Sequence, residues 1–171
     1  TKKVTQLSRQ EFTPNTGVAV AGKNPPGVYN LGPCPLPGGR VMFTSNRNGF
    51  APTKGYTPTT LQLFTMDDNG GNVEMVGHLN INSALHPTIL KDGRVMFTTY
   101  ESQGLRDLRN WGLWTIHPDG TNWGPLMSSF VSASAFHFMT QLSDGHVVVE
   151  EYYNLNNLGF GTYYKMAAQA P

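Results

Sequence analysis

One phrase recurs three times in this chain, and its spacing limits what the chain can fold into. The glycines that precede its apolar triplets, Gly39, Gly93 and Gly145, are separated by 54 and 52 residues. A regular period of this size is typical of architectures that stack similar supersecondary units. The three copies are "PGGRVMFTSNR" at residues 37–47, "KDGRVMFTTYES" at 91–102 and "SDGHVVVEEYYN" at 143–154.

Each copy predicts a two-residue turn, Gly-Gly or Asp-Gly, followed by a strand. The glycine supplies the positive φ that a tight reversal needs. The triplets 41–43, 95–97 and 147–149 are continuously apolar, which indicates strands covered on both faces. Parallel sheets also have such strands, but they need crossover helices, and no segment between the copies has a capped helical period.

A second hairpin follows each of the first two copies. With it, each repeat has enough strands to form a sheet, and neighbouring sheets can cover both faces of the apolar strands. "LQLFTMDDNGGNVEMVG" predicts strands near 61–66 and 72–76, and "GLWTIHPDGTNWGPLM" predicts strands near 113–117 and 122–127. Two hairpins per repeat make a four-stranded antiparallel meander. Such sheets bury both faces when they stack radially. The fold class expected is therefore all-β, a β-propeller of four-stranded blades.

About three blades are expected, which form only part of a ring. Closed propellers contain about four to eight blades. We expect the remaining blades to come from the same polypeptide or from another chain. The predicted division is an N-terminal arm or strand of a neighbouring blade at 1–27, blade one at 28–80, blade two at 81–130, and an incomplete blade three at 131–171.

Composition excludes several classes of partner. Of the 171 residues, 13% are charged and the net charge is +1, so no basic field attracts nucleic acid. No apolar run approaches the roughly 18 residues of a membrane span. The chain starts at Thr1 without an initiator methionine or a signal-like segment. We expect a processed, trimmed or incompletely represented product.

The single cysteine, Cys34, rules out an internal disulfide, a multi-cysteine metal site and a CxxCH haem attachment within this sequence. Its setting, "GPCPLPGG", predicts a small side chain packed under a proline-rich bend. Low charge together with abundant Gly, Asn, Thr and Tyr is typical of periplasmic or extracellular β-proteins.

The phrase "DGRVMFTTYES…GLWTIHPDGTN" resembles the Tol-type propeller repeat, and the resemblance covers residues 28–166. Longer phrases, such as "LQLFTMDDNGGNVE", "SASAFHFMTQLSDG" and "EYYNLNNLGFGT", resemble the N-terminal propeller of the hydrazine synthase alpha subunit and its periplasmic relatives. In that family the propeller precedes domains that carry c-type haem, and the complex makes hydrazine from nitric oxide and ammonium.

The resemblance implies an exported protein in a redox assembly, with haem-bearing subunits as possible partners. Haem is expected only in domains outside this chain or in partner subunits, and no cofactor is expected in the chain itself. No catalytic residue is carried over. In unit one, Gly38-Gly39 replaces the usual Asp-Gly.

Two of the five histidines are candidates for a channel or rim site. His86 and His137 both fall on the predicted innermost strand of a blade, seven and eight residues before the turn glycine, so they are equivalent only if one strand carries a bulge. Hydrogen-bonded structural histidines are favoured over metal ligands. His117 is expected to be solvated and His146 to be a polar strand-end residue.

The other candidates follow the second strands or lie in a loop. Glu101, Glu150 and Tyr152 are rim candidates. Glu150 and Glu151 point to opposite faces of a strand and cannot act as a carboxylate pair. A loop cluster, either an ion-pair network or a docking patch, contains Arg106, Asp107 and Arg109.

Three functions remain open on the sequence alone. The leading hypothesis is a non-catalytic scaffold or docking module, because packed blades with variable loops suffice for that role. The second is an enzyme subunit whose funnel contributes to a metal or substrate site with His86, His137 and Glu150. The third is a carbohydrate- or peptide-binding propeller that uses aromatic side chains, although blade packing is the favoured role of Trp111, Trp114 and Trp123.

Overall fold

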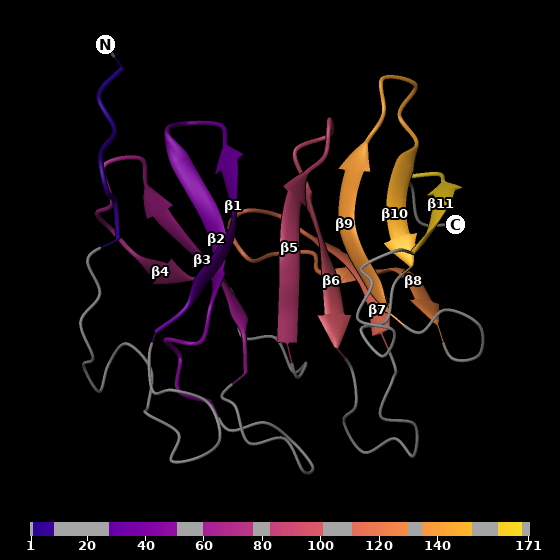
Figure 1. Cartoon of the computed structure of the whole chain (residues 1–171), viewed down its shortest axis with the longest axis horizontal. Helices are drawn as coiled ribbons and strands as arrows, with labels where there is room; N and C mark the ends of the chain where they lie inside the picture. The colour runs from indigo at the N-terminus through magenta and orange to yellow at the C-terminus, as the bar shows by residue number, and fades with distance from the viewer. Residues whose placement is uncertain are drawn as a thin grey trace.

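Three antiparallel β-sheets follow one another across the molecule in the computed structural model (Figure 1). The structure describes residues 2–8, 28–50, 60–76, 83–100, 111–129, 135–151 and 161–168. Within these ranges every regular element is a strand, and there is no helix long and apolar enough to cross a membrane.

The sheets are the predicted blades of a partial β-propeller. Blade one is β1 (Asn30–Leu36), β2 (Arg40–Ser45), β3 (Gln62–Asp67) and β4 (Glu74–Met75); blade two is β5 (Ser83–Ile89), β6 (Val95–Tyr100), β7 (Trp111–Ile116) and β8 (Gly124–Ser129); blade three is β9 (Phe136–Gln141), β10 (Val147–Glu151) and β11 (Thr162–Met166). Strands pair in chain order within each blade. The repeated phrase forms the second strand each time, as predicted.

The turn between the first and second strands of a blade is longer than the predicted two residues. In blade two, Gly93 donates its N–H to the Leu90 carbonyl, and Leu90 donates to the Arg94 carbonyl, so three residues lie in the loop. Blade three repeats these bonds. This is a type I turn followed by a left-handed glycine, Gly93 with φ 90°. The Asp92 carboxylate caps the turn by accepting the backbone N–H of Arg94 at 3.0 Å.

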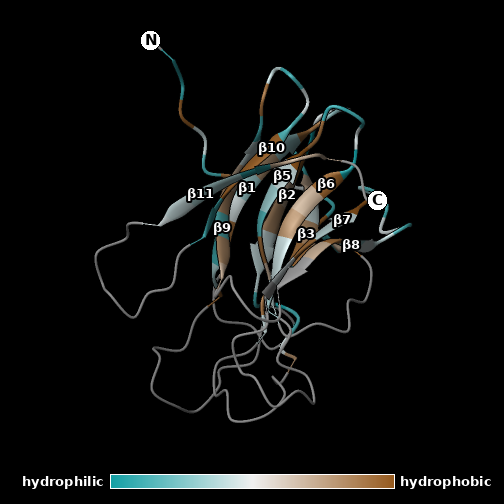
Figure 2. Ribbon diagram, turned by 90° about the vertical axis from the view of Figure 1, so that its right-hand side faces the viewer, coloured by the Kyte–Doolittle hydropathy of each residue, from teal (hydrophilic) through white to brown (hydrophobic). Residues whose placement is uncertain are grey.

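Two apolar cores lie between the blades, and β6 contributes to both. Its side chains alternate: Val95 and Phe97 pack into the core shared with blade one, whereas Met96 packs into the core shared with blade three. The hydropathy colouring of Figure 2 places the apolar residues along the strands. The continuous apolar triplet therefore reflects a sheet covered on both faces.

The outer blades are less buried than the middle blade on the faces that point away from it. All six residues of β6 are buried. In β2 and β10 one member of each triplet, Val41 and Val148, is only half-buried, because its face points away from blade two. Cys34 is 5% exposed in the first core, as expected, and burial raises the pKa of its thiol.

Candidate functional site

Two histidines from different blades meet at the innermost strands. Nε2 of His86, on β5, lies 3.0 Å from Nδ1 of His137, on β9, which is hydrogen-bond distance. The ring centroids are 5.1 Å apart and the ring planes cross at 71°. The sequence placed both histidines on innermost strands, and the structure brings them into contact across the boundary between two blades.

A β-bulge at the same place in every innermost strand sets this geometry. The register shifts by one residue in β1, β5 and β9. At each bulge one residue has a left-handed backbone, with φ 56° at Gly32, 56° at His86 and 44° at Phe138. Each of the three lies seven positions before the turn glycine of its own unit.

The bulges decide the conditional prediction that the two histidines are equivalent only if one strand carries a bulge. Since all three strands carry the bulge, rather than one of them, the counterpart of His86 in blade three is Phe138. His137 is one position earlier and meets His86 through packing of one blade on the next. Residues with positive φ other than glycine are uncommon and often mark functional positions.

Burial keeps both imidazoles neutral near neutral pH. Removal from water lowers the pKa of His86 below its ordinary value. The pKa of His137 falls to about 4, first because of burial and second because of repulsion from His86. In a neutral pair one ring donates and the other accepts, and either tautomer satisfies the bond.

An exposed aromatic ring and a glycine flank the pair. Phe138 is 64% exposed, and its ring centroid lies 4.7 Å from that of His86. On the other side, a Cβ added at Gly32 would lie 3.5 Å from Cδ of Pro87 and 3.7 Å from Cα of His86. Blade one therefore approaches the His86 backbone closely and places no side chain beside it.

Glu150 stands opposite His137 in the register of blade three and is 8% exposed. A Cβ at Gly161 would lie 2.7 Å from Cγ of Glu150, so the absence of a side chain at Gly161 allows the chain to cover this carboxylate. Among the residues that the structure describes, no three His, Cys, Asp or Glu side chains gather closely enough to hold a metal.

The remaining predicted rim and loop residues lie outside the described residues and stay predictions: Glu101, Tyr152, Arg106, Asp107 and Arg109. Two other histidines are placed. His146 is exposed, with its Nδ1 3.3 Å from Asp144, as expected of a strand-end residue. His117 is half-buried rather than solvated.

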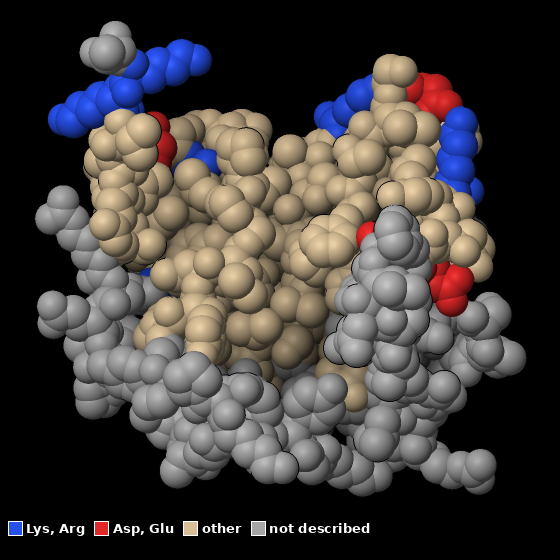
Figure 3. All heavy atoms as spheres, viewed as in Figure 1, with Lys and Arg blue, Asp and Glu red and all other residues tan. Residues whose placement is uncertain are grey.

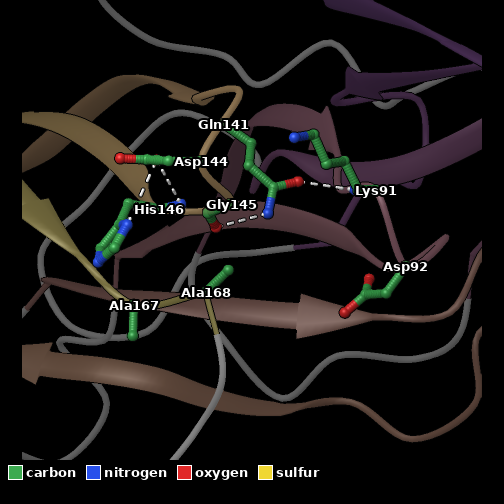
Figure 4. A pocket seen from close by; sticks show the side chains of 8 residues that line it. All are labelled: Lys91, Asp92, Gln141, Asp144, Gly145, His146, Ala167 and Ala168. Carbon is green, nitrogen blue, oxygen red and sulfur yellow. Dashed lines mark hydrogen bonds and ion pairs between the residues drawn. The ribbon is translucent and has the colours of Figure 1, made fainter.

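A groove of about 370 Å³ lies between the turns of blades two and three (Figure 4). Its polar groups bond to one another. The Lys91 N–H donates to Oε1 of Gln141 at 2.7 Å, and the Lys91 ammonium donates to the Ser143 carbonyl at 2.6 Å. Lys165 lies 2.7 Å from Asp144 and, together with other bonds, lowers the Asp144 pKa to about 2. The two Lys91 contacts join blades two and three, whereas the Lys165–Asp144 contact lies within blade three.

A second hollow, of about 450 Å³, lies between residues 5–8 and the outer face of blade one. Arg47 lines it, with its guanidinium carbon 4.9 Å from the Phe43 ring centroid and 5.3 Å from that of Phe64. Arg47 was not among the candidate residues predicted from the sequence. A signal was present, because Arg47 occupies the position that holds Glu101 in the second repeat.

The indole rings of Trp114 and Trp123 stack on each other, with centroids 4.8 Å apart. Trp114 also packs against the core shared by blades one and two. This agrees with the packing role that was favoured for them. Trp123 is 41% exposed. The side chain of Trp111 lies outside the described part.

Comparison with known proteins gives fold likenesses at low identity. No family model matches the chain, and no curated protein matches it. A TolB protein of Agrobacterium tumefaciens is 24% identical with a TM-score of 0.46, and the match covers 59% of this chain and 34% of that protein.

Two further solved structures are similar. An oligogalacturonate lyase in complex with manganese is 14% identical with a TM-score of 0.42, over 83% of this chain and 36% of the lyase. The tricorn protease is 12% identical with a TM-score of 0.42, over 83% of this chain and 13% of the protease. The chain thus spans about a third or less of each of these proteins, and no residue role is carried over from them.

Proposed function

We propose that this chain is a non-catalytic β-propeller module that acts as a scaffold or docking piece of an exported, c-type-haem-associated redox assembly. The observation that carries the scaffold role is that both end blades carry apolar side chains on the faces away from blade two. On blade one, Phe43, Phe64 and Met66 form a cluster there, and these side chains are buried, with 3%, 6% and 9% exposed. Among the described residues outside blade one, Leu7 is the one packed against it.

Blade three presents apolar groups on its outer side. Val148 is half-buried, and Tyr163, which pairs with Glu150 on the same face, is 70% exposed. Sheet faces of this kind are covered in a closed ring, and large apolar patches on a protein surface mark interaction sites. Figure 3 shows a largely uncharged surface across the middle of the face in view, with charged residues at its upper left, upper right and right margins. Further blades, from the same polypeptide or another chain, fit both ends.

The link to haem rests on the sequence resemblance to the hydrazine synthase alpha propeller. With one cysteine, the chain cannot itself attach haem through CxxCH. The haem of such an assembly would therefore lie in other domains or in partner subunits. Export to the periplasm or the cell exterior belongs to the same proposal, as does the absence of a haem bound by this chain.

Isolation of the assembly from its source, through a tag on this chain, tests the proposal. We expect the c-type haem absorbance to co-migrate with the chain at a mass well above 18.8 kDa. Tyr163→Glu, at a site 70% exposed on the outer side of blade three, should release the partner, whereas Leu31→Glu, at a site 47% exposed on the innermost strand of blade one, should not. A haem-free 18.8 kDa species would contradict the proposal.

A second candidate is an enzyme subunit whose funnel holds a metal or substrate. The contact between His86 and His137 favours it, because both lie on strands that face the ring axis and both are neutral near neutral pH. The third candidate, a carbohydrate- or peptide-binding propeller, has weaker support, since Trp114 and Trp123 stack on each other. A ligand array would test it.

A further inference from the structure

We propose that His86 and His137 form a two-histidine binding site for a divalent transition-metal ion, of the Zn²⁺ type, at the axis side of the boundary between blades two and three. The proposal is independent of the scaffold role. It names an ion and two ligand atoms, Nε2 of His86 and Nδ1 of His137.

The distance between the two nitrogens is close to that of two ligands on one ion. With zinc–nitrogen bonds of about 2.0–2.1 Å and tetrahedral angles, two imidazole nitrogens lie roughly 3.3 Å apart. The pair is 3.0 Å apart without an ion. A small rotation of the two rings opens this gap by the few tenths of an ångström required.

The two rings are in the protonation state that metal binding needs. A neutral imidazole offers a lone pair, and burial favours the neutral form of both histidines. The proton now shared between the nitrogens belongs to one ring. On binding it moves to the other nitrogen of that same ring, so both rings stay neutral and no further reactant is needed.

The fold does not need a side chain at the His86 position. The same bulge position in blade one is Gly32, which adopts φ 56° without strain. His86 adopts φ 56° with a side chain present, and the next residue after His137, Phe138, is also left-handed at 44°. Strained backbones of this kind persist where the side chain has a use.

A buried hydroxyl lies on the face of β6 that points toward blade three. Thr98 Oγ1 is a buried side-chain atom with no hydrogen-bond partner. Thr98 is two residues from Met96, which faces blade three, and it pairs with Leu85, the neighbour of His86.

The surroundings of the pair are partly open to solvent. His86 and His137 are both half-buried, Phe138 beside them is 64% exposed, and the nearby Gly32 carries no side chain. Two protein ligands with water or a third group describe an accessible site rather than a closed structural one. Nitrogen donors without thiolate favour zinc, copper or nickel.

Equilibrium dialysis of the full chain against Zn²⁺ near neutral pH, followed by metal analysis, tests the site. We expect one ion per chain and a rise in the thermal midpoint on binding. His86→Asn should weaken binding by about tenfold to a hundredfold or more, because asparagine tolerates a left-handed backbone but is a poor zinc ligand. His137→Gln should do the same.

The matched controls are His146→Asn and His117→Gln, which leave the pair intact and should keep full binding. Far-UV circular dichroism checks the fold of each variant. Histidine-ring NMR of the unaltered chain gives a readout that needs no mutation, since Zn²⁺ should shift two of five imidazoles. The proposal would be overturned if the chain failed to bind one Zn²⁺ ion. It would equally be overturned if the control variants lost as much binding, or if Zn²⁺ shifted the NMR signals of other histidines.

Discussion

The backbone N–H of Lys91 donates a 2.7 Å hydrogen bond to Oε1 of Gln141, which ties the turn of blade two to the innermost strand of blade three. The Gln141 amide also donates to the Gly145 carbonyl at 2.8 Å. One side chain thus holds its own turn and the neighbouring blade together.

Replacement of Gln141 by alanine should lower the free energy of unfolding by about 1–2 kcal/mol, because two backbone groups lose their partner. Chemical denaturation of the full chain measures this. Thr140→Ala, at an exposed neighbouring position, is the control and should change stability little. Equal losses in the two variants would contradict the cross-blade role of Gln141.

Phe97→Ala should be among the most destabilising single changes. Phe97 is fully buried in the core between blades one and two, and truncation of a buried phenylalanine costs about 3–5 kcal/mol. Phe138→Ala removes a ring that is 64% exposed and should cost much less. Thermal unfolding compares the two. A larger effect at Phe138 would show that its exposed ring stabilises the fold.

Gly32→Ala should destabilise the chain by about 1 kcal/mol, since an alanine there must adopt a left-handed backbone. A Cβ at Gly32 would meet only ordinary contacts, the nearest at 3.5 Å, so φ rather than space sets the cost. Gly124→Ala is the matched control, because a Cβ there meets nothing within 4 Å and φ is not positive. Urea unfolding should give a lower midpoint for Gly32→Ala than for Gly124→Ala. Equal midpoints would contradict a left-handed backbone at the Gly32 bulge.

In metal-free buffer, lowering the pH should lower the free energy of unfolding, because the two paired histidines become protonated. The folded-state pKa of each histidine lies below its ordinary value of 6.5, and that of His137 is about 4. Between these values the unfolded chain binds more protons than the folded one. The free energy of unfolding is therefore largest above 6.5 and falls as the pH drops toward 4.

Urea titrations across this pH range measure how steeply the free energy of unfolding changes with pH. His137→Gln should flatten it, because it removes the group with the larger shift. His146→Gln should leave it unchanged, since His146 lies at an exposed strand end. A slope identical in wild type and His137→Gln would exclude the pair as the cause.

The repeated phrase was sufficient to predict the strands and the stacking. Val95, Met96 and Phe97 are continuously apolar. Without crossover helices, this pattern predicts a strand that is covered on both faces of the sheet. All residues of β6 are indeed buried. The alternation of these side chains between two cores follows from the period of a strand.

The bulges were not predictable in the same way. Glycine is the strongest signal of a positive φ in a sequence, and the three left-handed bulge positions hold Gly32, His86 and Phe138. Because two of these positions hold residues other than glycine, the sequence did not indicate that the three occupy the same bulge position. The contact between His86 and His137 depends on that geometry and on packing between residues 51 positions apart, which no local pattern encodes.

The complete enclosure of β6 sets a gradient of local opening along the molecule. Its amide groups lie in a strand paired on both edges, between two cores, while each outer sheet has a core on one side and a less covered face on the other. In a linear array of units coupled to nearest neighbours, the central unit has two interfaces and the terminal ones have one. Amide hydrogens of β6 should therefore exchange with deuterium last, with fraying that begins at both flanks and moves inward.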